Sequence, residues 1–125
     1  MIVLQTLAVM LLAQATPPAM IDNADAAQGQ RDAAYEELVN GDTDGAIARL
    51  EAGLIDNPQD PALLINLGSA WAARGNADRA AEYYRAAARS DVRYRLELAN
   101  GEWVDSRTAA RLALRALEQT GLAMN

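Results

Sequence analysis

Apolar and small residues between positions 61 and 73 follow the spacing of one helix face. They recur at i, i+3, i+4 and i+7, as Leu64, Leu67, Gly68 and Trp71. Pro61 suits the first helical position after Asp60, which is a typical N-cap residue. Gly75 suits the helix end, because glycine adopts the left-handed conformation without steric penalty. The pattern predicts this helix, a short turn, and a second helix that runs to about Ser90.

The same arrangement occurs once more, 34 residues earlier in the chain. A shift of 34 places Gly41-Asp42-Thr43-Asp44-Gly45-Ala46 over Gly75-Asn76-Ala77-Asp78-Arg79-Ala80. We therefore predict two further helices, at about residues 31–40 and 43–56. The second of these is expected to end at Asn57-Pro58, because the residue before a proline is disfavoured in the helical conformation.

The pattern changes after Ser90. Residues 92–98 alternate between apolar and charged side chains, which is the period of a half-buried strand. Asn100-Gly101 is typical of a two-residue hairpin turn. Together they predict a β-hairpin at about 92–104. A short helix over residues 91–99, ended by Asn100-Gly101, is the alternative.

A last helix is predicted at about residues 105–119, with Asp105 or Ser106 as its N-cap. Its apolar stripe is expected to consist of Ala109, Leu112, Ala113, Ala116 and Leu117. Thr120-Gly121 is expected to end it, which leaves residues 120–125 as a tail. Because a single helical pair cannot bury its own apolar face, we interpret the hairpin and this helix as a cap on the second pair.

The first 21 residues carry no charged side chain. Their apolar part, Ile2 to Ala13, is shorter than the roughly 20 residues that a membrane-spanning helix needs. Ala13-Gln14-Ala15 has the small-x-small pattern of a signal peptidase site, so we expect residues 1–15 to be a signal peptide cleaved after Ala15. Residues 16–30 are rich in Pro, Ala and polar side chains and are expected to form a flexible linker. An uncleaved interfacial anchor and an ordinary amphipathic helix are the alternatives for the first segment.

The composition excludes most of the common catalytic mechanisms. The 125-residue chain has room for one small domain and contains no Cys, no His and no Lys. It therefore lacks disulfides, thiolate metal sites, the usual general base at neutral pH, and the amine required for a Schiff base. A net charge of −6 argues against general binding of nucleic acid.

Residues 61–91 resemble a tetratricopeptide repeat. The family's signature positions are occupied by Leu64, Leu67, Gly68, Trp71, Gly75, Ala80, Tyr84 and Ala87. Residues 27–60 resemble a more degenerate copy, which keeps Ala34, Gly41, Ala46, Leu50 and Pro58. Val92 replaces the closing proline of the second copy, and Gln30 and Ala33 stand where large apolar residues are expected. The resemblance implies a mainly α-helical solenoid domain over residues 31–119, with two helical hairpins that bind protein and have no catalytic role.

The resemblance also implies where a partner would bind. The family holds peptide segments on the concave face formed by the first helix of each repeat. The corresponding positions in this sequence are Arg31, Tyr35, Leu38, Val39, Ala62, Ile65, Asn66, Ser69 and Ala73. Asn66 stands where chaperone-binding members place an asparagine against the ligand backbone, whereas Tyr35 stands where those members have another asparagine. The alternative is that these nine residues pack against the linker or the cap.

Two further groups of charged residues have a non-functional interpretation. Arg107, Arg111 and Arg115 recur every four residues and could bind an anion, but a solvated helix face is the simpler interpretation. The acid pairs Glu36-Glu37, Asp42 with Asp44, and Asp56 with Asp60 could serve a carboxylate hydrolase. Acids at helix ends and in turns usually act as caps instead.

The sequence as a whole predicts a small exported module of the bacterial cell envelope, periplasmic or secreted. It would bind a protein or peptide segment without a cofactor, a metal or nucleic acid. A membrane-tethered structural subunit, in contact with the membrane through an uncleaved N-terminus, is the alternative.

Overall fold

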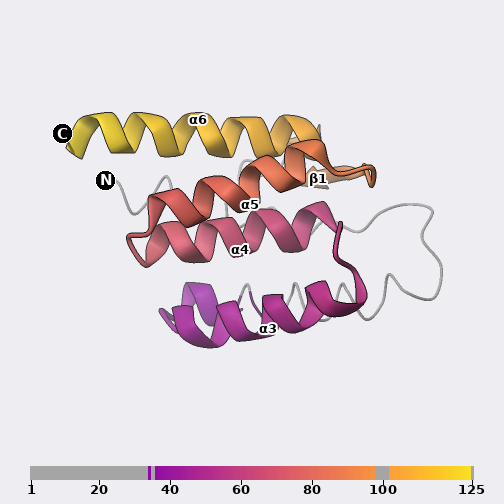
Figure 1. Ribbon diagram of the computed structural model, residues 1–125, viewed down its shortest axis with the longest axis horizontal. Coiled ribbons are helices and arrows are strands. Elements are labelled where there is room, and N and C mark those ends of the chain that lie inside the picture. Colours follow the sequence, from indigo (N-terminus) through magenta and orange to yellow (C-terminus); the bar gives the residue numbers. More distant parts are fainter. Residues whose placement is uncertain (1–33, 35, 98–101, 125) are drawn as a thin grey trace.

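A computed structural model of the chain describes residue 34, residues 36–97 and residues 102–124. Helices lie side by side in one layered stack, with α3 at one side and α6 at the opposite side (Figure 1). The predicted signal peptide, the predicted linker and the expected Asn100-Gly101 turn lie outside the described residues, as do Arg31 and Tyr35.

The helices of the two repeats begin and end close to their predicted positions. Residues 36–39 are helical, α3 spans Thr43–Asp56, α4 spans Pro61–Ala73 and α5 spans Ala77–Arg89. Asp42, Asp60 and Asn76 are the N-caps, and each accepts a hydrogen bond from a backbone N–H of the first turn. Gly41 and Gly75 have φ angles of +84° and +88°, so the left-handed conformation predicted after the first helix of each repeat is present.

Gly68 allows α4 and α5 to approach closely. A β-carbon at this position would lie 2.5 Å from Cε1 of Tyr84 and 3.1 Å from the carbonyl oxygen of Ala80. Trp71 lies one turn further along α4 and is partly buried, with the Arg79 guanidinium 4.5 Å from the centre of its ring. Gly68 is therefore a point of close approach between the two helices, and the Tyr84 ring is its main neighbour on α5.

A two-stranded antiparallel sheet follows α5, formed by β1 (Arg95–Glu97) and β2 (Trp103–Asp105). The predicted hairpin is confirmed over the alternative of a short helix. Its register pairs Glu97 with Trp103, whereas a two-residue turn at Asn100-Gly101 would pair Glu97 with Val104. In the observed register Leu96 lies opposite Val104 and is fully buried.

Helix α6 spans Ser106–Met124 and continues through Gly121, where the sequence predicted its end. Its buried face also differs from the predicted stripe. Ala109, Ala110 and Ala113 are buried, whereas Leu112 is 43% exposed. The small alanine side chains let α6 lie close to its neighbours. This close packing places the alanine face inward, although Leu112 on another side of the helix is larger.

Two clusters of buried side chains form the core. The N-terminal cluster joins residues 34–38, α3 and one side of α4: Ala34, Leu38, Ala46, Ile47, Leu50, Leu63, Leu67 and Ala70. The C-terminal cluster joins α4 to α5, the hairpin and α6: Ala62, Leu64, Ile65, Ala80, Tyr84, Ala87, Tyr94, Leu96, Ala109, Ala110 and Ala113. Helix α4 contributes to both clusters, so it is the central helix of the stack. In the part of the chain that the structure describes, no helix is both long enough and apolar enough to cross a membrane.

Candidate partner-binding face

Seven of the nine predicted groove residues lie within the described part of the chain. Five of them are buried: Leu38, Ala62, Ile65, Asn66 and Ser69. The other two, Val39 and Ala73, are exposed, and Val39 is 52% exposed. We refer to these seven residues as the first-helix face, because they come from the first helix of each repeat.

Ala62 and Ile65 have neighbours that explain their burial. Both belong to the C-terminal cluster, together with Tyr94 and Leu96 of the hairpin region. The Tyr94 hydroxyl lies 3.3 Å from the Ala62 backbone nitrogen, which donates to it. Ala62 and Ile65 therefore pack against the cap, which the sequence offered as the alternative to a binding groove.

Ser69 also has partners within the fold. Its hydroxyl lies 3.1 Å from the Ile65 carbonyl oxygen, to which it donates, and 3.0 Å from the Tyr84 hydroxyl. Burial raises the pKa of Tyr84 to about 12, although the hydrogen bond with Ser69 acts in the opposite direction. The tyrosine therefore stays neutral, and the pair is a buried link between α4 and α5.

Asn66 differs from its neighbours. Its side chain is fully buried, and neither the amide nitrogen nor the amide oxygen has a hydrogen-bond partner among the described residues. A buried polar group without partners costs about 1–3 kcal/mol relative to one whose hydrogen bonds are satisfied. Most buried side-chain amides in proteins are paired, so an unpaired one requires an explanation.

Val39 and Ala73 occupy equivalent positions in the two repeats, 34 residues apart. Ala73 lies seven residues after Asn66, so the two share one side of α4. Both exposed residues are at the C-terminal ends of the first helices. They mark the end of the first-helix face that is open to solvent.

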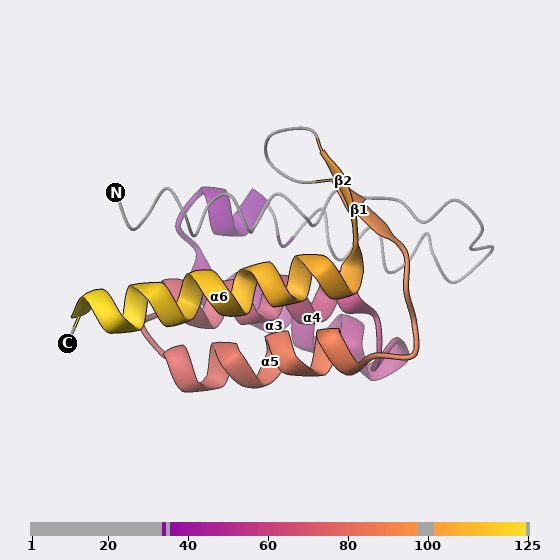
Figure 2. The same cartoon turned by 90° about the horizontal axis from the view of Figure 1, so that it is seen from above.

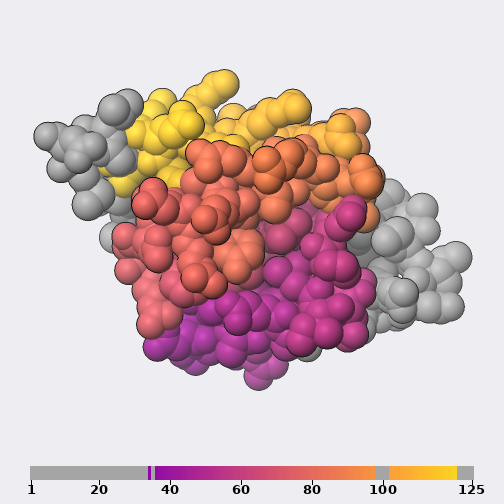
Figure 3. All heavy atoms as spheres, viewed as in Figure 1, coloured from indigo at the N-terminus to yellow at the C-terminus, as the bar shows by residue number. Residues whose placement is uncertain are grey.

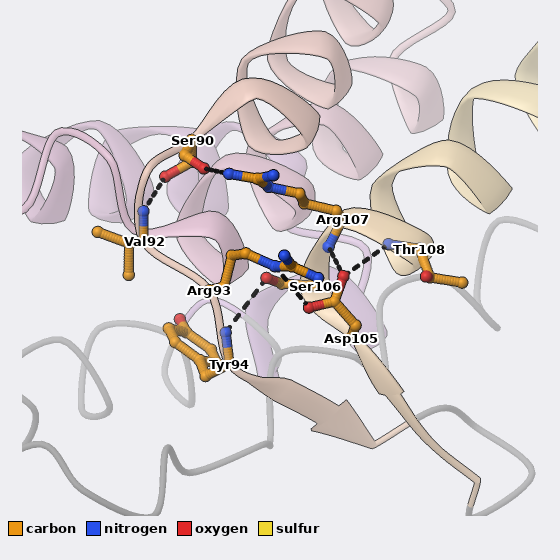
Figure 4. A network of polar contacts seen from close by, with 8 residues as sticks. All are labelled: Ser90, Val92, Arg93, Tyr94, Asp105, Ser106, Arg107 and Thr108. Carbon is orange, nitrogen blue, oxygen red and sulfur yellow. Dashed lines mark hydrogen bonds and ion pairs between the residues drawn. The ribbon is translucent and has the colours of Figure 1, made fainter.

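A polar network fixes the hairpin to the helices (Figure 4). The sequence predicted Asp105 or Ser106 as the N-cap within it, but not the contacts of Arg93 and Arg107. Asp105 accepts hydrogen bonds from the backbone nitrogens of Arg107 and Thr108, so it is the N-cap of α6. Arg93 Nε donates to Asp105 at 3.0 Å. This hydrogen bond, together with the positive charge of Arg93, holds the pKa of Asp105 below its usual range.

Arg107 belongs to this network, which corrects its predicted place on a solvated stripe. Its Nη2 donates to the Ser90 carbonyl oxygen at 3.0 Å, so the side chain lies over the end of α5. The carbonyl groups at a helix end lack intrahelical partners, and a guanidinium is well suited to bind them. Arg111 and Arg115 are exposed, as expected.

The acid pairs have structural roles. Asp42 and Asp60 cap helices, Glu37 pairs with Arg49, and Asp44 lies 3.0 Å from Arg74. In the residues described, no three or more His, Cys, Asp or Glu side chains come together as a possible metal site. The arrangement therefore offers packing surfaces and hydrogen-bonding groups to a partner.

Comparison with known proteins agrees with this geometry. Residues 31–91 match the family model described as tetratricopeptide repeat. Neither the comparison with curated proteins nor that with solved structures gave a match. Domains of this family typically mediate protein–protein interactions without catalysis. A hairpin and a final helix pack behind the matched segment, and residues 31–91, with their two helix–turn–helix units, belong to the tetratricopeptide repeat family.

Proposed function

We propose that the protein binds a segment of a partner protein on the first-helix face, with Asn66 as the polar anchor. The unpaired amide of Asn66 carries this proposal. An apolar side chain of similar shape would fit the same buried position without the cost of an unsatisfied amide. If a partner supplies the missing hydrogen bonds, their formation offsets the cost of the buried amide and explains why asparagine occupies this position.

The chemistry of an amide defines what the partner presents. Asn66 offers donors from its nitrogen and an acceptor oxygen on one planar group. A peptide unit of an extended segment offers the complementary acceptor and donor, whereas the backbone groups of a helix are already paired within it. An extended stretch of polypeptide is therefore the partner that fits. Because Asn66 is fully buried, the first-helix face must open for that segment to reach it.

Site-specific photo-crosslinking tests the proposal. A photoreactive side chain at Val39 or Ala73 would sit at the exposed end of the first-helix face, and one at Glu82 would sit on the outer side of α5. Crosslinks from Val39 and Ala73 should reach the same segment of the same partner protein, and Glu82 should not. The Asn66→Leu change should remove both crosslinks. Crosslinks from Glu82 equal to those from the other two positions, or crosslinks that survive Asn66→Leu, would refute the proposal.

We further propose that the protein works in the bacterial cell envelope after cleavage behind Ala15. This rests on the apolar segment Ile2 to Ala13 and the Ala13-Gln14-Ala15 pattern. Mass spectrometry of the protein recovered from cells should give a chain that begins at Thr16. A mass that includes residues 1–15 would favour a membrane-tethered subunit instead.

A further inference from the structure

Charge is divided unequally between the two halves of the described chain. Residues 36–60 contain seven acidic side chains and one arginine, which gives a net charge of −6. Residues 74–124 contain nine arginines and seven acidic side chains, which gives a net charge of +2. The overall charge of −6 therefore conceals an acidic first repeat and a weakly basic C-terminal part.

The basic charges gather on α5 and α6. The end of α5 lies beside the beginning of α6, as the hydrogen bond from Arg107 to Ser90 requires, and the surfaces of the two helices adjoin (Figure 3). Four exposed arginines on these helices form the basic face: Arg85, Arg89, Arg111 and Arg115.

No side chain in the described part of the chain forms an ion pair or a hydrogen bond with these four guanidinium groups. Arg85 and Arg89 are spaced i,i+4, as are Arg111 and Arg115, and like charges at this spacing repel. Glu82 and Glu118 are exposed one turn away on the same helices, but neither pairs with an arginine. Leu112, which is 43% exposed, lies beside Arg111. The basic face thus combines uncompensated charge with an exposed apolar side chain.

Helix α3 presents the complementary surface. Its exposed side carries Asp44, Glu51 and Asp56, with Ile55 between the last two at 82% exposure. We call this set the acidic face. Asp44 is paired with Arg74, so Glu51 and Asp56, together with the exposed Ile55, are the counterpart of opposite charge to the basic face.

In the described part of the chain, no ion pair joins the basic face to the acidic face of the same molecule. Helix α3 and helix α6 form the two sides, with α4 and α5 between them (Figures 1 and 2). We propose that the basic face of one copy binds the acidic face of a second copy, so that the chain self-associates head to tail. Such a contact uses two different surfaces of each copy and leaves one of each free at the ends. It extends the stack of helices from one molecule into the next.

Sedimentation of two reciprocal variants tests this arrangement. Arg111→Glu with Arg115→Glu leaves two arginines and two glutamates on the basic face, which then has no net charge. Glu51→Arg with Asp56→Arg leaves Asp44 as the one acid of the acidic face, which then has a net charge of +1. All four positions are exposed, so circular dichroism should show both variants folded. At low ionic strength the wild-type mass should rise with protein concentration, and 0.5 M NaCl should return it to the monomer by screening the charges.

Each variant alone should remain monomeric, because it no longer has one face of net positive charge and one of net negative charge. An equimolar mixture should form dimers and stop there, since only one complementary pair of faces is left. A chain with all four substitutions keeps the wild-type net charge but has no complementary pair of faces. It should therefore stay monomeric, which separates the effect of facial complementarity from that of total charge. Wild-type protein that stays monomeric at low ionic strength, or a mixture that forms no dimer, would overturn the proposal.

Discussion

At the scale of single residues, Gly68 shows how the absence of a side chain at one position allows α4 and α5 to lie close together. The Tyr84 ring occupies the space that a β-carbon at this position would need. Two helices approach closely only where the side chains between them are small or absent. The sequence predicts this contact because Gly68 sits in a helix interior, where glycine is otherwise unfavourable.

The Gly68→Ala substitution should lower the free energy of unfolding by about 1–3 kcal/mol, because the added methyl group overlaps the Tyr84 ring. Urea denaturation followed by circular dichroism measures the change. A second Tyr84→Leu substitution removes the ring, so the added cost of Gly68→Ala should be smaller in that background. Equal costs in both backgrounds would show that Tyr84 is not the source of the strain.

The burial of the first-helix face was not predictable residue by residue. Ala62 and Ile65 follow the spacing of a concave surface, but the hairpin and α6 lie against them. A helix pattern indicates which residues share a side; it does not indicate which later segment packs there. For the same reason the predictions that Leu112 is buried and that Arg107 lies on a solvated face were wrong. The rotation of α6 about its axis depends on its contacts with α5 and the hairpin.

At the scale of elements, the hairpin is held at its base by side chains. The Tyr94 hydroxyl contacts Asp60, which caps α4, and Arg93 pairs with Asp105, which caps α6. A two-stranded hairpin alone is only marginally stable in water, so these contacts help to fix it on the helices. The alternation of residues 92–98 predicted the strands, whereas the contacts at the base join residues too far apart in sequence for a pattern to show.

Asp105 gives this junction a pH dependence. A carboxyl group whose pKa is lower in the folded protein stabilises it above the unfolded pKa, near 4, and loses that contribution as the pH falls through the folded value. The wild-type free energy of unfolding should therefore fall as the pH drops below about 4. Asp105→Asn keeps an acceptor for the α6 N-cap and should cost less than about 1 kcal/mol at pH 7.

Urea denaturation of both proteins at pH 7 and pH 3 checks this. The difference between wild type and Asp105→Asn should shrink at pH 3, where the wild-type carboxyl gains a proton. A difference that is unchanged between the two pH values would mean that the charge of Asp105 contributes nothing to the junction.

At the scale of the whole molecule, the hairpin and α6 complete a stack that two repeats alone would leave open. Residues of α6 and the hairpin region cover Ala62 and Ile65 of the central helix α4. Repeat proteins are stabilised by contacts between neighbouring units, so the terminal unit needs a covering element. The family pattern predicted the two helical pairs and a cap, and the structure adds that α6 packs against α4 as well as α5.

A chain that ends at Ser90 should therefore lose its cooperative thermal transition, because Ala62, Ile65, Ala80 and Tyr84 lose their contacts with the hairpin and α6. Circular dichroism should show a broad, non-sigmoidal melt, and binding of a hydrophobic dye should increase. A sharp transition near the wild-type midpoint would show that the two repeats are stable without the cap.

The most direct test of the central claim is the free energy of unfolding of Asn66→Leu. If the amide is unpaired in the free protein and kept for a partner, the substitution should raise this free energy by about 1–3 kcal/mol. Ser69→Ala, on the same face, should lower it by about 1 kcal/mol, because the Ser69 hydroxyl is bonded to Ile65 and Tyr84. A comparable loss of stability in Asn66→Leu would contradict the account, because the amide would then be a satisfied part of the core.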